Sequence, residues 1–189
     1  MKKFKTLLEE LNACGDAREF AADKTIEQVI AECPRGDWML WLAKKVDIGL
    51  RPLTLAKGHC AATVLHLMKD ERSKKAVEVS IAYGENNATD GELRAAADAA
   101  AYAAAAYAAA AAAADADAAD AAAYAAYAAA ADADAADAAA ADADAADAAA
   151  ADAAAYREAK VKNQLATADI CRKYIGELII TKVNELLNA

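Results

Sequence analysis

His59, Cys60 and His66 are the first candidates for covalent chemistry in this chain. A histidine beside a cysteine can serve as the base that generates a thiolate nucleophile. These residues fall, however, in a segment from Thr54 to Met68 whose apolar spacing predicts a helix. Adjacent residues on a helix point about 100° apart, and residues six apart face each other poorly. We therefore expect no catalysis from this group.

A second candidate chemistry is the binding of divalent cations by aspartates. The decapeptide Ala-Asp-Ala-Asp-Ala-Ala-Asp-Ala-Ala-Ala occurs three times, starting at Ala114, Ala131 and Ala141. Carboxylate oxygens suit Ca²⁺ and Mg²⁺. On a helix, however, the three aspartates of one repeat diverge, and the glycine and glutamate of an EF-hand loop are missing. We therefore predict no metal site.

The sequence also lacks a phosphate loop, a dinucleotide fingerprint, a nucleophile elbow and a histidine-rich metal motif. We therefore expect no cofactor and no enzymatic activity.

These aspartates belong to a tract, residues 95–156, that contains 46 Ala, 11 Asp and 5 Tyr and nothing else. Alanine is the best helix former, and both Ala and Asp are depleted in strands, so the tract should be helical. As one straight helix it would span ~93 Å. We expect it instead to fold back as a hairpin or repeat-like bundle of Ala-rich helices. The alternative is one long helix that projects from the rest of the protein.

The remainder of the chain predicts an all-α fold, a helical bundle. Residues 1–90 should form an N-terminal helical bundle, 91–156 the Ala/Asp-rich helical segment, and 157–189 an amphipathic helix packing on the N-terminal bundle. The apolar stripe expected on that last helix uses Ile170 or Cys171, Tyr174 or Ile175, Leu178, Val183, and Leu186 or Leu187. This stripe needs a partner, which favours a tract that leaves the core and returns.

Several helix starts can be predicted from capping residues. Asp16, Thr25 and Asp37 should each cap a helix, and Thr89 or Asp90 should cap the helix that enters the tract. Residues 47–52 read as a loop, because they contain Gly49 and Pro52.

Charge and cysteine content limit the setting in which the protein works. The net charge is −9 and residues 95–156 contribute −11, so the rest of the chain carries −9 + 11 = +2. No secretory signal and no membrane-spanning run is evident. The four cysteines lack the spacing of a zinc site. We expect a cytoplasmic protein with reduced, mostly buried thiols.

Trp38 and Trp41 have the spacing of core residues, with Leu42 on the same helical face. Tryptophan is also favoured at interaction hot spots. Both roles are kept open at this point.

Three segments of the sequence resemble a known family. They are Gly36-Asp37-Trp38-Met39-Leu40-Trp41-Leu42-Ala43, Leu55-Ala56-Lys57-Gly58-His59-Cys60-Ala61-Ala62, and Thr167-Ala168-Asp169-Ile170-Cys171-Arg172. Arranged around an Ala/Tyr/Asp-rich tract, they resemble immunity proteins that are associated with bacterial polymorphic toxin systems and that also occur in phage-like sequences. The resemblance implies an all-helical protein that binds a toxin, and it brings no catalytic residues.

The expected function is therefore the neutralisation of a toxin or defence factor through protein–protein contact. The candidate partner-contact residues are Asp115, Asp117, Asp120, Asp132, Asp134, Asp137, Asp142, Asp144, Asp147, Trp38 and Trp41. We expect a protein partner, no membrane and no direct nucleic-acid contact, and the sequence leaves the oligomeric state open.

Two alternatives have a different physical basis. A structural or ice-binding role would fit an Ala-rich helix, but the tract contains no Thr and repeats at five, ten and seventeen residues. An acidic mimic of nucleic acid, used in phage counter-defence, would need about one charge per 1.7 Å of axis, whereas the extended tract offers about one per 8 Å.

Overall fold

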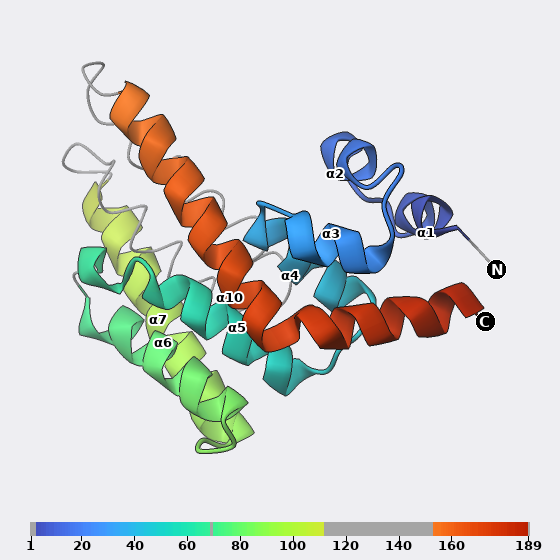
Figure 1. The fold of residues 1–189 in the computed structure, drawn as a ribbon. Coiled ribbons are helices and arrows are strands. Elements are labelled where there is room, and N and C mark those ends of the chain that lie inside the picture. Colours follow the sequence, from blue (N-terminus) through green and yellow to red (C-terminus); the bar gives the residue numbers. More distant parts are fainter. Residues whose placement is uncertain (1–2, 69, 112–152, 189) are drawn as a thin grey trace.

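In a computed structural model, the chain is described over residues 3–68, 70–111 and 153–188, with side chains from 3–68, 70–102 and 159–188. Every secondary-structure element in these residues is a helix, so the predicted all-α bundle is confirmed (Figure 1). In chain order they are α1 (Phe4–Glu10), α2 (Gly15–Phe20), α3 (Ile26–Glu32), α4 (Gly36–Lys45), α5 (Leu50–Ala62), the 3₁₀ turn η1 (Leu65–Leu67), α6 (Glu71–Gly84), α7 (Asp90–Ala111) and α10 (Ala153–Asn188).

The C-terminal helix α10 closes the core over the N-terminal helices, as its predicted stripe requires. It packs against α3, α4 and α5 and touches α1. Figure 1 shows that it bends about midway along its length. Its buried side chains recur every four residues: Cys171, Ile175, Ile179 and Val183. The predicted place of Leu178 on this stripe is wrong, because Leu178 is 41% exposed. Of the alternatives Leu186 and Leu187, Leu187 packs against the core and Leu186 is 41% exposed.

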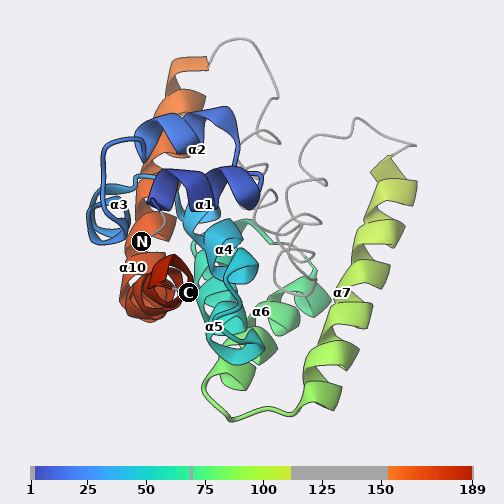
Figure 2. The same ribbon diagram turned by 90° about the vertical axis from the view of Figure 1, so that its right-hand side faces the viewer.

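Helices α5, α6 and α7 lie side by side in chain order, each farther from α10 than the one before. Helix α5 packs on α6, and α6 packs on α7. Figure 2 shows the result, with α10 at one side, α7 at the other, and α4, α5 and α6 between them. The contact between α5 and α6 is close at Gly84, where a Cβ atom would lie 2.3 Å from the Cβ of Leu55. Only glycine fits at that crossing.

Helix α7 carries the first part of the Ala-rich tract. A capping box starts it, as predicted: the Glu92 N–H donates to Thr89 Oγ1 at 3.2 Å, and the Thr89 N–H donates to Glu92 Oε2 at 2.8 Å. Ala100 on α7 is buried against Ala76 on α6, and Ala96 packs beside them. The predicted hairpin and its alternative, the projecting helix, concern residues 112–152, which lie outside the described residues. Both stay predictions.

Of the three other predicted helix caps, two are wrong and one is confirmed. Thr25 caps α3 through a capping box with Gln28. Helices α2 and α4 begin before the expected aspartates, with Cys14 and Arg35 as their N-caps and no capping hydrogen bond from either side chain. Asp16 and Asp37 therefore fall in the first turn, where a carboxylate still favours the helix dipole.

The predicted loop over residues 47–52 is also wrong at its end, because α5 begins at Leu50. Pro52 is tolerated there, since the N–H groups of a first helical turn have no intrahelical partner. The helix then stops at Ala62 rather than at Met68. The Thr63 hydroxyl lies 2.7 Å from the Cys60 carbonyl oxygen and 2.9 Å from Asn163 Oδ1 of α10, within hydrogen-bond distance of both. Such side-chain hydrogen bonds compete with the backbone hydrogen bonds that would continue the helix.

Candidate functional site

The two tryptophans lie half-buried on α4, between its buried and its exposed sides. Their neighbours Met39 and Leu40 are almost completely buried, and the tryptophans pack against the same core from its edge. Trp38 and Trp41 each therefore have both roles, because part of each ring packs in the core and part faces outward.

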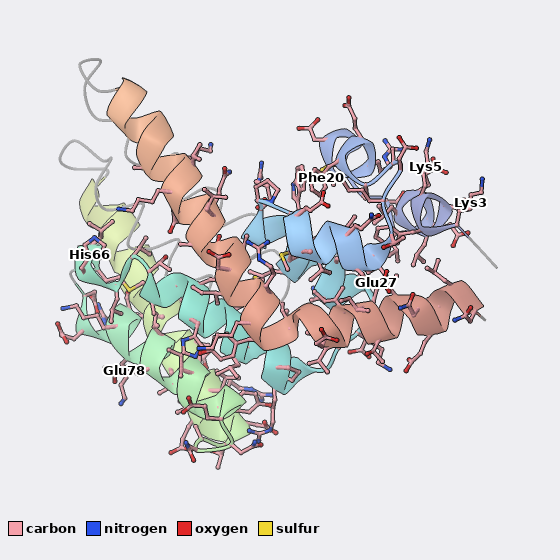
Figure 3. The ribbon with its side chains drawn as sticks, viewed as in Figure 1. Lys3, Lys5, Phe20, Glu27, His66 and Glu78 are labelled. Carbon is pink, nitrogen blue, oxygen red and sulfur yellow. The ribbon has the colours of Figure 1, made fainter. Side chains whose placement is uncertain are left out.

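A third aromatic residue, Phe20 from α2, joins them. Its ring centroid lies 6.1 Å from that of Trp38, with the planes tilted by 55°. Figure 3 shows Phe20 on the part of α2 nearest α3. We call Phe20, Trp38 and Trp41 the aromatic face. The sequence predicts a helix that starts at Asp16, but it carries no signal that Phe20 meets α4.

Each ring of the aromatic face has a cation over it. Lys24 Nζ lies 3.6 Å from the centroid of Phe20, Arg35 Cζ 4.9 Å from Trp38, and Lys45 Nζ 5.9 Å from Trp41. Such contacts add about 0.5–1 kcal/mol each at exposed positions and restrain both side chains. The face is therefore aromatic with a cationic border.

Beneath this face is a cavity of about 410 Å³. Its walls come from α1, α2, α3, α4 and the loops between them. Most of the lining side chains are apolar, and the polar contribution includes Arg35 and Asp37. Phe20, Trp38 and Trp41 all line it, so the aromatic face and the cavity form one site.

Arg35 and Asp37 form an ion pair in the cavity wall. Arg35 donates through Nε to Asp37 Oδ1 at 2.7 Å and through Nη2 to Oδ2. Asp37 is only 7% exposed. Its hydrogen bonds raise the pKa of Arg35 above the ordinary value, while partial burial acts in the opposite direction. Arg35 is therefore charged at neutral pH, and the pair offers both donors and an acceptor on one wall.

Three of the four cysteines are buried, as predicted, and Cys14 is exposed; all four are free thiols. Cys60 and Cys171 place their sulfurs 3.9 Å apart between α5 and α10. The hydrogen bond with Cys60, together with burial, raises the pKa of the Cys171 thiol well above its ordinary value. Burial likewise raises the pKa of Cys33. Such thiols stay protonated and lack the depressed pKa of a catalytic nucleophile.

His59 and Cys60 have separate partners on α10. The His59 ring stacks on Tyr174 with centroids 4.3 Å apart and planes 10° from parallel. Its Nε2 atom is buried and has no hydrogen-bond partner among the described residues. The pKa of His59 is lowered from its ordinary value, mainly by burial. Glu85 acts to raise this pKa, and Lys173 acts to lower it. His66 lies at the end of the molecule away from Phe20 (Figure 3).

The predicted acidic contact residues, Asp115 to Asp147, lie outside the described residues. Among the residues that are described, no group of three or more His, Cys, Asp or Glu side chains could hold a metal ion. In the same part of the chain, no helix combines the length and the apolar character that a membrane crossing needs.

Comparison with protein-family models, with curated proteins and with solved structures finds no match to this chain.

Proposed function

We propose that this chain is a non-enzymatic binding protein that acts in the cytoplasm and neutralises a toxin or defence factor through protein–protein contact, as an immunity protein does. The observation that carries the proposal is the aromatic face. Three half-buried rings from α2 and α4 line one site there, each with a cation over it, and Phe20 contacts Trp38.

This arrangement has the properties of an interaction hot spot. Binding energy at protein interfaces is concentrated in a few tryptophan, tyrosine and arginine side chains. Immobilising a flexible side chain on binding costs about 0.5–1.5 kcal/mol. Trp38 is already held by Phe20 and Arg35, so little of this cost remains to be met when a partner docks.

The acidic tract supports the same function in a different way. Residues 95–156 carry eleven aspartates and no basic residue. Local charge of one sign accelerates the encounter with a partner of opposite charge, and the effect falls with added salt. The tract would then raise the association rate with a basic partner, while the aromatic face would determine how long the complex lasts.

The test uses purified toxin domains from bacterial polymorphic toxin systems, with binding followed by biolayer interferometry. Trp38→Ala and Trp41→Ala should each weaken the affinity by about thirtyfold, which is the effect of losing a hot-spot residue. Tyr102→Ala is the matched control, because Tyr102 is an aromatic residue that is 72% exposed on α7, away from this face. It should change the affinity less than twofold, about the scatter of surface substitutions.

Three results would count against the proposal or a part of it. A wild-type chain that binds none of the toxin domains has no immunity role toward that class. A complex that tolerates both tryptophan substitutions is held by some surface other than the aromatic face. An association rate that ignores ionic strength would remove the acidic tract from the mechanism.

A further inference from the structure

The cavity beneath the aromatic face is larger than one side chain needs. A dry cavity of about 150 Å³ in another protein is enough to bind benzene. The cavity here, about 410 Å³, exceeds that by more than twofold and falls within the range of small-molecule sites, about 300–1,000 Å³. It has room for a molecule of two or three fused rings.

The walls of the cavity favour a flat aromatic occupant. Phe20, Trp38 and Trp41 present ring surfaces, whereas Leu8, Ile30 and Met39, which also line the cavity, are only 2–5% exposed. Offset or tilted stacking on aromatic rings adds about 0.5–1.5 kcal/mol beyond the burial of area. A flexible aliphatic chain would gain the burial without the stacking.

One wall also offers a polar edge. Arginine has five N–H donors, and Arg35 gives two of them to Asp37. Each Asp37 oxygen accepts one of these bonds and keeps further acceptor capacity. A donor and an acceptor therefore stand side by side. The complementary group is a neutral edge that carries an N–H next to a C=O, as in a lactam.

Helix α2 forms the wall of the cavity that can be displaced. It has six residues, and none of them is buried. The elements that open first in a protein are those with few buried apolar contacts. A ligand can therefore enter by displacing α2 while the core formed by α3, α4 and α10 stays packed.

We propose that this cavity is a binding site for a free, planar, mainly apolar aromatic molecule of two or three fused rings that carries a lactam-type edge. The rings stack on the aromatic face, and the edge pairs with Arg35 and Asp37. This site goes beyond the proposed protein–protein function, because its ligand is a small molecule and not a protein. Its failure would leave the toxin-binding proposal standing.

The probe is 2-quinolinone, a two-ring lactam, titrated into the full chain by calorimetry. Its matched control is 1-methyl-2-quinolinone, which keeps the rings and the carbonyl but loses the N–H. Indole N–H signals in a nitrogen-15 correlation spectrum give a second readout, because Trp38 and Trp41 are the only tryptophans in the chain.

The matched protein variants are Ala21→Leu and Ala31→Leu. Ala21 is 2% exposed and lines the cavity, so leucine there should occupy the space. Ala31 is exposed on the neighbouring helix α3 and does not line it. Ala17→Leu, on α2 and half-buried at the cavity, serves as a second filling variant if Ala21→Leu does not fold.

We expect one molecule of 2-quinolinone to bind and to shift both indole signals. The filling variant should weaken binding at least tenfold, Ala31→Leu should leave it within about twofold, and the N-methyl compound should bind about tenfold more weakly for lack of one buried hydrogen bond. Absence of heat and of indole shifts up to the solubility limit overturns the site. Equal binding to Ala21→Leu and to the wild type also overturns it. Equal binding of the two compounds overturns the polar edge.

Discussion

Replacing Ile179 by alanine tests whether α10 closes the core in the register described above. Ile179 is completely buried and lies on the stripe with Cys171, Ile175 and Val183. Alanine removes three carbons, which at about 0.8 kcal/mol per buried carbon costs about 2.4 kcal/mol. The cavity left behind brings the loss to about 3–4 kcal/mol. The better helix propensity of alanine offsets only about 0.4 kcal/mol of this.

The matched control is Leu178→Ala, one residue earlier on the same helix. Leu178 is 41% exposed, so its truncation should cost about 1 kcal/mol or less. Urea unfolding followed by circular dichroism measures both free energies, and a thermal melt should show roughly a 6–16 °C loss for Ile179→Ala. If Leu178→Ala costs as much as Ile179→Ala, the described register of α10 is wrong and the reasoning fails with it.

Four further substitutions test individual contacts. Burial lowers the pKa of His59 in the folded chain, so as the pH falls the unfolded chain takes up this proton first. The free energy of unfolding should therefore decrease below about pH 6.5, until the pH has passed the pKa of the folded state. His59→Phe should flatten this part of the curve of unfolding free energy against pH. An unchanged slope in the variant would show that His59 is not the group responsible. Gly84→Ala should destabilise by about 1–3 kcal/mol, because its Cβ would meet Leu55 at 2.3 Å. Gly91→Ala, whose Cβ would have only Thr89 Oγ1 within 4 Å, should instead stabilise by up to about 1 kcal/mol; equal effects of the two substitutions would contradict the close crossing. Thr89→Ala should cost about 1 kcal/mol in denaturant unfolding by removing the capping box of α7, and no measurable loss would mean that the box contributes nothing.

The helical class and the partner of the last helix could be predicted from local pattern alone. A stripe that repeats every three or four residues cannot stay exposed, so α10 had to meet the N-terminal helices. The pattern placed Leu178 on the stripe, which is wrong, because Ile179 and Ile180 follow directly and are equally apolar. Only the position of α3, α4 and α5 decides which of the three side chains is buried.

The aromatic face and its cavity could be predicted only in part. The tryptophan spacing pointed to α4, but the spacing of core residues and that of contact residues are the same, and the structure gives both tryptophans a share of each role. Phe20 reaches Trp38 through the path of the chain between α2 and α4, which no periodicity encodes. The ion pair of Arg35 and Asp37 could be predicted from the local sequence, because the two residues are two positions apart at a helix start that follows Pro34.

The Ala/Asp-rich tract and the core make different kinds of contribution, and residue chemistry separates them. Alanine offers little apolar surface, so a segment of Ala and Asp gains little from burial, whatever its arrangement. The large buried side chains of the described residues come from before Asp90 and after Arg157, and the buried apolar cluster between α6 and α7 consists of alanines. What the tract contributes is charge: without its −11, the rest of the chain would carry +2. Changing the number of Ala/Asp repeats should therefore alter the strength of any electrostatic attraction to a partner far more than it alters the free energy of unfolding.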